Sequence, residues 1–398
     1  MGKKKRGTFL DKKITRREFL KYALTGVIGF GVGAYFLRRV FTSPLALNNT
    51  NLTTPSSALS WNVKEAYHYS QLAGGLVECQ VCPNHCRLTE KQRSICRVKE
   101  NISGKLYTFV YGNPCAVHID PIEKKPLYHF LPGSGAFSIA TAGCNFRCLN
   151  CQNWEISQFP PEKTNNIKLM PKEVVEYAIA KKCNSIAYTY SEPTAFYEYM
   201  YDTAKLAHEK GIKNLWITNG YMSEGALSDF CQYLDAANVD LKSFKEEIYN
   251  KLNSGHLQPV LDTLKLLPKK GVWLEITNLI VPTYTDDLDM IREMCKWIRD
   301  ELGTDVPLHF SRFSPHYKLK HLPATPYSTL KKAREIALEA GLKYVYIGNV
   351  AELEGQQTYC PKCKKVVVRR NGFSVLEINL TNGRCKYCGE RIAGVWSL

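Results

Sequence analysis

The chain between residues 137 and 350 alternates short apolar runs with longer amphipathic stretches. Short apolar runs are typical of strands buried in a parallel sheet, and apolar residues that recur every three or four positions are typical of helices packed on its faces. This alternation predicts a βα repeat with a parallel sheet, an α/β fold. The expected strands are Phe137–Thr141, Ser185–Tyr190, Asn214–Thr218, Ala237–Leu241, Val272–Val281, Pro307–Ser311 and Tyr344–Gly348, and the expected helices include Lys172–Lys182, Thr194–Lys210, Asp286–Leu302 and Ser328–Gly341.

Polar residues follow several of these expected strands. In βα barrels the active site lies at the carboxyl ends of the strands, so such residues are candidates for ligand contacts. A carboxylate such as Glu192 suits an ammonium group, Asn219 and Asp240 suit ribose hydroxyls, and Lys242 suits a carboxylate. His309 is the candidate on the sixth strand. Taken singly, each residue equally fits a helix cap or a turn, and their joint placement is what indicates a site.

Three cysteines follow the first expected strand within eight residues: Cys144, Cys148 and Cys151. Thiolates this close together suit a [4Fe–4S] cluster, and a cube held by three of them keeps one iron open for a ligand. The alternatives are part of a zinc site and cysteines that are buried as small hydrophobic residues. The apolar strand that runs directly into the loop favours the cluster.

Eight of the other twelve cysteines form two further groups. Pairs with C-x2-C spacing are typical of metal sites, because neighbouring thiolates point at one centre. The C-terminal group has two such pairs around an alternating β-branched run, which resembles a zinc ribbon and predicts a structural zinc. The N-terminal group suits either zinc or a second iron–sulphur cluster, and the sequence leaves both open. The C-terminal cysteines are Cys360, Cys363, Cys385 and Cys388, and the N-terminal cysteines are Cys79, Cys82, Cys86 and Cys96.

Positive charge is concentrated at the start of the chain. The first 45 residues contain 11 Lys or Arg and 2 acidic residues, a net charge of +9, so the remainder contributes +7 of the total of +16. The remainder is only moderately basic and lacks the aromatic motifs of common RNA-binding modules. Nucleic acid is therefore not an expected partner, and a metal-stapled nucleic-acid or protein-binding module is not the favoured function.

The basic start also contains a targeting motif. Thr15–Lys21 includes two adjacent arginines and precedes the uncharged Tyr22–Leu37, which resembles a twin-arginine export signal. The apolar stretch is short for a membrane span, and no small-x-small cleavage site follows it. A cleaved signal, a retained membrane anchor and a basic helix that stays inside the cell all remain open. Residues 46–75, rich in Ser, Thr, Asn and Pro at their start, are expected to be a flexible linker.

The C-x3-C-x2-C spacing of Cys144, Cys148 and Cys151 resembles the signature of the radical S-adenosylmethionine (SAM) superfamily. The resemblance implies that the open iron binds SAM and that an electron from the cluster cleaves SAM to a 5′-deoxyadenosyl radical, with a reductant such as ferredoxin or flavodoxin. It also implies a partial TIM-type (βα)6-like barrel. Asn150 departs from the pattern, since the superfamily often has an aromatic residue there. This chemistry suggests a cytoplasmic location, whereas the leader suggests a membrane-anchored or exported protein.

Longer motifs narrow the resemblance to the radical enzyme of the AmmeMemoRadiSam system, which is similar to the activating enzymes of pyruvate formate-lyase. The resemblance implies hydrogen abstraction from an unidentified substrate, or activation of a glycyl-radical protein partner, with Memo-type and AMMECR-type proteins as partners. The basic turn Lys124–Pro126 and His129 could line the mouth of the site or contact an acidic partner, although a solvated turn is the favoured interpretation. The motifs are Asp120–Gly133, Gly143–Cys148, Cys151–Gln158, Tyr188–Thr194 and Gly394–Trp396.

These observations divide the chain into five parts. A leader or anchor covers residues 1–45, and the linker covers 46–75. A Cys-rich metal-binding segment covers 76–130, the barrel covers 131–350, and a zinc-ribbon-like module covers 351–398. A chain of this length can bury one large core with small satellites.

Overall fold

The computed structural model describes residues 61–397. The predicted leader and the first half of the predicted linker, residues 46–60, lie outside the described residues. Within 61–397, no helix is both long and apolar enough to cross a bilayer.

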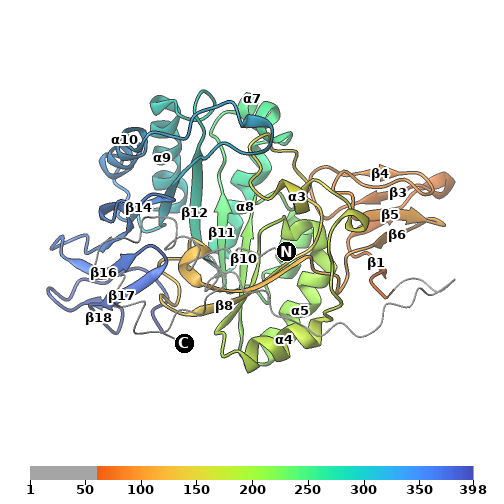
Figure 1. Cartoon of the computed structure of the whole chain (residues 1–398), viewed down its shortest axis with the longest axis horizontal. Coiled ribbons are helices and arrows are strands. Elements are labelled where there is room, and N and C mark those ends of the chain that lie inside the picture. The colour runs from red at the N-terminus through yellow and green to blue at the C-terminus, as the bar shows by residue number, and fades with distance from the viewer. Residues whose placement is uncertain (1–60, 398) are drawn as a thin grey trace, which may run out of the picture. The chain divides into compact units, whose positions relative to one another are not determined.

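An eight-stranded sheet forms the centre of the described chain (Figure 1). Strands β8 to β14 are parallel and lie in chain order, while β7 pairs antiparallel with β8 at one edge. Because β7 and β14 occupy opposite edges, the sheet is an open barrel rather than a closed one. The strands are β7 Ala116–Pro121, β8 Gly135–Ala140, β9 Ser185–Tyr188, β10 Lys213–Thr218, β11 Ala236–Asp240, β12 Trp273–Ile280, β13 Leu308–Arg312 and β14 Val345–Gly348.

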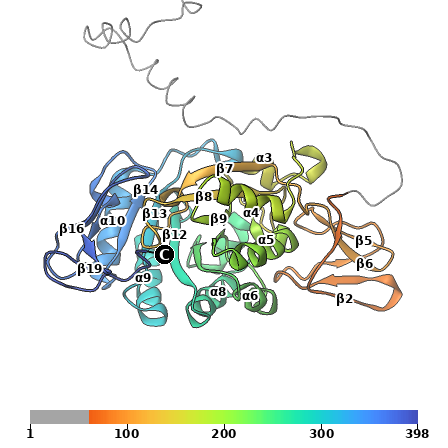
Figure 2. The same cartoon turned by 90° about the horizontal axis from the view of Figure 1, so that it is seen from below.

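Amphipathic helices connect the parallel strands and cover the sheet (Figures 1 and 2). Helix α9 illustrates the local cause: Asp287 caps its first turn by accepting from the amides of Asp289 and Met290, and Gly303 ends it with a positive φ. Its buried residues recur at helical spacing and face the core. The helices are α3 Trp154–Ser157, α4 Pro171–Ala180, α5 Tyr197–Glu209, α6 Glu224–Phe230, α7 Glu246–Ile248, α8 Gln258–Lys269, α9 Leu288–Leu302 and α10 Tyr327–Glu339.

All seven strands predicted from the apolar runs are present, with ends that differ by at most two residues. The four predicted helices are also present, although the one expected from Thr194 begins with a 3-10 turn, Pro193–Phe196. The prediction omitted α6, α8 and β7. Strand β7 adds an antiparallel edge to the barrel from within the segment that was assigned to the Cys-rich part.

Two small antiparallel sheets form an N-terminal module, which Figures 1 and 2 show on the opposite side of the barrel from the C-terminal strands. The prediction of a flexible linker up to residue 75 was wrong for residues 61–75. Residues Lys64 and Glu65 instead pair with β6, and Tyr69–Gln71 pairs with β3. The strands are β1 Lys64–Glu65, β2 Tyr69–Gln71, β3 Val77–Cys79, β4 Arg87–Leu88, β5 Lys99–Ile102 and β6 Lys105–Thr108.

The C-terminal module contains a three-stranded and a two-stranded antiparallel sheet. Arg370 attaches it to the barrel from a fully buried position: its guanidinium donates to the Tyr128 carbonyl at 2.7 Å and to Thr358 Oγ1 at 2.8 Å. A buried charge of this kind requires partners, and Glu123 supplies the opposite charge at 3.7 Å. The strands are β15 Thr358–Tyr359, β16 Val366–Asn371, β17 Ser374–Ile378, β18 Leu380–Thr381 and β19 Arg384–Cys385.

Candidate active site

The cysteine loop, residues 144–151, follows β8 at the carboxyl edge of the parallel sheet. Gly143, directly before the loop, has φ +99°, and its amide donates to the Ile156 carbonyl at 2.9 Å. The amides of Arg147 and Leu149 donate to the carbonyls of Asn253 and Leu252, each at 2.9 Å. These bonds fix the loop between the start of α3 and the segment after α7.

Two of the three sulphur atoms of the loop accept hydrogen bonds from the protein. The Phe146 amide lies 3.3 Å from Cys144 Sγ, and Asn253 Nδ2 lies 3.2 Å from Cys148 Sγ. Burial raises the pKa of all three thiols, that of Cys151 to about 11, and binding to a metal would displace their protons. Donors aimed at sulphur and a nearby ammonium, Lys242, suit thiolates that bind iron.

A cavity of about 1000 Å³ opens beside the loop, and all eight residues predicted for the cluster and its ligand contribute to its wall. The sequence prediction therefore named residues from the carboxyl ends of four strands, β8 to β11, together with His309, the second residue of β13. These residues are Cys144, Cys148, Cys151, Glu192, Asn219, Asp240, Lys242 and His309.

Glu192 is a buried carboxylate that joins two strand ends. Its Oε1 accepts from the Thr194 amide at 2.9 Å and from the hydroxyls of Thr194 and Thr218 at 2.7 Å each, and its Oε2 accepts from the Asn219 amide at 2.9 Å. Burial raises the pKa of Glu192, and these hydrogen bonds oppose that rise. Glu192 thus caps the turn that follows it as well as lining the cavity.

Asn219 connects the end of β10 to the cysteine loop. Its Nδ2 donates to Asn145 Oδ1 at 2.8 Å, and Asn145 Nδ2 donates to the Tyr221 carbonyl at 2.8 Å. The Asn219 Oδ1 accepts from the Tyr221 amide at 2.9 Å. Its amide group therefore positions the loop that carries Cys144.

Asp240 and Lys242 form an ion pair at the end of β11, with Lys242 Nζ 2.8 Å from Asp240 Oδ2. Lys242 was predicted to pair with a carboxylate. In the structure it pairs with the carboxylate of Asp240. Burial would lower the pKa of Lys242, but Asp240 and the sulphur of Cys148 outweigh burial and raise it. The pair therefore keeps an ammonium next to the cysteine loop.

His309 lies on β13, with its Nε2 2.7 Å from Glu275 Oε2. Glu275 is a buried acid on β12 that also accepts from the amides of Tyr128 and His129, at 3.0 and 2.7 Å. Burial alone would raise the pKa of Glu275, but the contact with His309 lowers it. The prediction missed Glu275, although an acidic residue inside an apolar strand is a signal for a buried polar contact.

The prediction of a solvated basic turn was wrong for Lys125 and His129, which are both buried. Lys125 Nζ lies 2.6 Å from Asp120 Oδ2, and Tyr190 donates to the same carboxylate. Burial lowers the pKa of Lys125 to about 8 against the opposing effect of Asp120. The basic residues of this turn gave no sign of burial, because Tyr190, which contacts the same Asp120 carboxylate, is distant in the chain.

Three polar atoms on residues of the cavity wall are buried and have no hydrogen-bond partner: Glu123 Oε2, Asn150 Oδ1 and Ser191 Oγ. Unpaired buried polar atoms are uncommon in folded proteins, and in a cavity they suit contacts with a bound ligand. Asn150 occupies the position that was noted as a departure from the superfamily pattern.

The C-terminal cysteines form a compact four-sulphur group, with all four sulphur atoms within 4.8 Å of one another. Cys360 Sγ and Cys388 Sγ are 3.6 Å apart, and Cys363 Sγ and Cys385 Sγ are 3.7 Å apart. Four ligands at the usual Zn–S distance of about 2.3 Å in a tetrahedron would be about 3.8 Å apart. The group could hold one metal ion.

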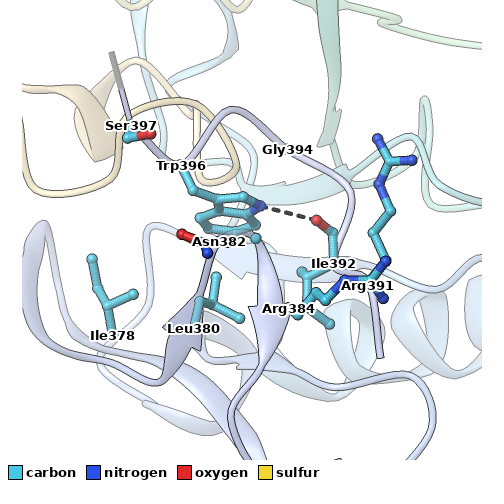
Figure 3. Close-up of a pocket in the computed structure, with 10 residues that line it drawn as sticks. Ile378, Leu380, Asn382, Arg384, Arg391, Ile392, Gly394, Trp396 and Ser397 are labelled. Atoms are coloured by element: carbon cyan, nitrogen blue, oxygen red, sulfur yellow. Dashed lines mark hydrogen bonds between the residues drawn. The ribbon is translucent and has the colours of Figure 1, made fainter. Parts of the chain in front are cut away.

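A second cavity of about 510 Å³ lies on the C-terminal module and shares no lining residue with the first. Figure 3 shows the Trp396 indole N–H donating to the Ile392 carbonyl, at 2.9 Å, with Arg384 and Arg391 nearby. No cysteine lines this cavity, so it is separate from the candidate active site.

Comparison with known proteins identifies the barrel. The model of the Radical SAM superfamily matches residues 138–298, which include the cysteine loop and four of the strand ends around the cavity. The chain belongs to the radical SAM superfamily. The radical SAM match begins within β8 and ends in α9, so the part that carries Cys144, Cys148 and Cys151 is the matched part.

Relatives of this radical SAM protein cover most of the described chain. It is 49% identical over 332 residues to "Uncharacterized protein MJ0808" of Methanocaldococcus jannaschii, across 83% of this chain and 99% of that protein. It is 24% identical over 218 residues to "Pyruvate formate-lyase 1-activating enzyme" of Escherichia coli, across 51% of this chain and 89% of that enzyme. The chain is thus a distant homologue of the activating enzymes and a member of the same family as the archaeal protein.

Two solved structures match parts of this chain with TM-scores below 0.5. One is a domain of a pyruvate-formate lyase-activating enzyme from Bacteroides vulgatus, with a TM-score of 0.37 and 13% identity over 42% of this chain and 99% of that domain. Another is SuiB of Streptococcus suis bound to the precursor peptide SuiA, with a TM-score of 0.43 and 13% identity over 56% of this chain and 50% of that protein.

Proposed function

We propose that this protein reductively cleaves SAM to a 5′-deoxyadenosyl radical that removes a hydrogen atom from a substrate. The observation that carries the proposal is the cavity whose wall contains three cysteines from one loop together with polar groups from the strand ends. No fourth cysteine lines this cavity among residues 61–397. A cluster held there by three cysteines would keep one iron open for a ligand.

The residues present fit the cluster. Cys144, Cys148 and Cys151 would be its ligands, and the donors Phe146 N–H and Asn253 Nδ2 already point at sulphur. When bound, the cluster supplies the electron for cleavage of the sulphonium. The protein's part is to hold the three thiolates on a fixed loop, and the ammonium of Lys242 lowers the cost of the negative charge there.

The residues also fit SAM. Asp240 is partly exposed in the cavity and suits the ribose hydroxyls, while the unpaired Ser191 Oγ and Asn150 Oδ1 offer further polar contacts. Glu192 and Asn219 keep the ends of β9 and β10 in register with the cysteine loop. In this proposal Glu192 and Asn219 position the site as much as they contact the ligand. His309 forms the wall on the β13 side.

The substrate belongs to one of two classes. Similarity to the activating enzymes supports a glycyl-radical protein partner, from which a glycine hydrogen would be removed. A small molecule is the alternative, since the cavity has room for one beside SAM. A reductant of the ferredoxin or flavodoxin class is required in both cases. Memo-type and AMMECR-type proteins are the proposed partners within the AmmeMemoRadiSam system, and zinc is proposed for the C-terminal cysteines.

The test uses the full chain, reconstituted anaerobically with iron and sulphide, reduced with dithionite and supplied with SAM. We expect 5′-deoxyadenosine from the unchanged protein and none from Cys148→Ala, because that variant loses a cluster ligand. Cys183→Ala is the matched control, since Cys183 is a buried cysteine that lies outside the cavity wall. Full activity in Cys148→Ala would contradict the proposal.

A further inference from the structure

The N-terminal cysteines converge in the module that precedes the barrel. Cys79 ends β3, and its amide donates to the Cys86 carbonyl at 3.0 Å across the turn that contains Cys82. Cys96 comes from the loop before β5, and its sulphur lies 3.1 Å from Ser94 Oγ. Two separate loops therefore bring the four side chains to one place.

The surroundings of these sulphur atoms are largely buried, and the buried ammonium among them, that of Lys99, is paired with Glu198. The charge on Cys82 interacts with those of its three partners, and all four cysteines pack on the same apolar core. The ammonium of Lys99, 1% exposed, interacts with Cys79 and Cys96. The four sulphur atoms therefore lie close enough to interact within one largely apolar site.

The spacing of the sulphur atoms differs from that of the C-terminal cysteines. Among residues 61–397, the C-terminal cysteines are the only group of three or more metal-ligating residues whose ligand atoms all lie within 4.8 Å of one another. Among the described residues, no three of the N-terminal cysteines, and not the three of the cysteine loop, have sulphur atoms that all lie within 4.8 Å of one another. Ligands of one ion must crowd around it, whereas ligands of a cluster bind different irons and stay farther apart. The wider spacing favours an iron–sulphur cluster over a single zinc ion.

The N-terminal cysteines lie directly against the cysteine loop. Asn84, between Cys82 and Cys86, donates through Nδ2 to the Asn145 carbonyl at 2.9 Å. Arg147 donates to the Ile95 carbonyl, next to Cys96, at 2.9 Å. Gly143 approaches so closely that a Cβ there would lie 2.6 Å from the Cys96 carbonyl oxygen. The two cysteine groups are thus joined by hydrogen bonds between their own loops.

We propose that Cys79, Cys82, Cys86 and Cys96 hold a second iron–sulphur cluster, which passes single electrons from an external donor to the cysteine loop. The relay role rests on the proposed function, whereas the cluster itself does not. One electron leaves a donor of the ferredoxin or flavodoxin class, reduces the N-terminal cluster and moves on to the cluster at the cysteine loop. No bond forms or breaks at the N-terminal site, which returns to its oxidised state.

The test compares the full chain with two double variants, Cys82→Ser/Cys86→Ser and Cys144→Ala/Cys148→Ala, after anaerobic reconstitution. Iron, acid-labile sulphide and zinc are measured per chain, with electron paramagnetic resonance (EPR) spectra of the reduced proteins. Sulphide matters because a single ion at the C-terminal cysteines contributes none. We expect each double variant to hold about half the iron and sulphide of the unchanged chain, and Cys115→Ser to hold all of it. Zinc without sulphide at the N-terminal cysteines would overturn the proposal.

The relay is tested by the reductant. With reduced flavodoxin, we expect Cys82→Ser/Cys86→Ser to form 5′-deoxyadenosine at least tenfold more slowly than the unchanged chain, while dithionite supports similar rates in both. Equal rates with flavodoxin would overturn the relay. Should Cys82→Ser/Cys86→Ser fail to fold, the iron and sulphide in Cys144→Ala/Cys148→Ala still decide whether the cluster exists. If that variant holds a cluster but the unchanged chain never cleaves SAM, the N-terminal cluster site is upheld and the proposed function is refuted.

Discussion

Glu192 shows how a single residue can serve both the fold and the cavity. Four donors from three residues meet its two oxygens, and these donors belong to the ends of two neighbouring strands. A carboxylate is needed because every neighbour donates. The sequence predicted Glu192 as a site residue and offered a helix cap or a turn as an equal alternative. In the structure Glu192 lines the cavity and also caps the turn that follows it.

Replacing Glu192 by Gln tests this role. The Gln amide would turn a donor toward the Asn219 amide or the Thr218 hydroxyl, which costs about 1–3 kcal/mol for an unpaired buried group. We expect lower stability in urea unfolding and SAM binding weakened about tenfold. Glu176→Gln, on the exposed face of α4, is the control and should change neither. Unchanged SAM affinity in Glu192→Gln would argue that the strand ends do not form the SAM site.

At the scale of elements, Gly143 lies at the contact between the N-terminal module and the barrel. Its φ of +99° is unfavourable for a side chain, and a Cβ would lie 2.5 Å from Val98 Cγ1. We expect Gly143→Ala to displace the cysteine loop, lower the iron content after reconstitution and reduce 5′-deoxyadenosine formation.

Gly225→Ala is the matched control for that variant. Gly225 lies within α6, where a Cβ would meet nothing within 4 Å. Alanine at a compatible helical position stabilises a protein by about 0.4–1 kcal/mol. Normal iron content in Gly143→Ala would show that the loop tolerates the displacement.

The sequence could predict the parallel strands because each is an apolar run buried on both faces. It could not predict β7, whose exposed edge residues alternate little, or α8, whose pattern is interrupted by Pro259 and Pro268. The cavity-wall residues that follow β8 to β11 could be predicted because the carboxyl ends of parallel strands meet at one edge. Lys125 and Glu275 could not, because their burial depends on partners that are distant in the chain.

At the scale of the whole molecule, His129 joins the barrel to the C-terminal module. Its Nδ1 donates to the Ala393 carbonyl at 2.6 Å, and Tyr346 hydrogen-bonds to its Nε2. Burial lowers the pKa of His129 to about 4; Glu275 opposes this shift, and Arg370 and His309 add to it. The junction is therefore built for a neutral imidazole.

This pKa predicts how stability depends on pH. Between pH 6.5 and about 4 the unfolded chain binds a proton at His129 that the folded chain does not, so the free energy of unfolding falls as pH falls, by up to about 3 kcal/mol. His129→Phe should be less stable at pH 7, because Ala393 and Tyr346 lose a partner, but should show a shallower pH dependence. His321→Gln, at an exposed position, is the control. Equal slopes in urea unfolding for His129→Phe and the unchanged chain would contradict this account.

The central claim is that the cysteine loop holds a cluster whose open iron binds SAM. The most direct measurement is the EPR spectrum of the reduced Cys82→Ser/Cys86→Ser protein, with and without SAM, since this variant isolates the cluster at the loop. We expect SAM to change the spectrum and 5′-deoxyadenosine to appear on warming. A cluster spectrum that SAM leaves unchanged, with no cleavage product, would contradict the account.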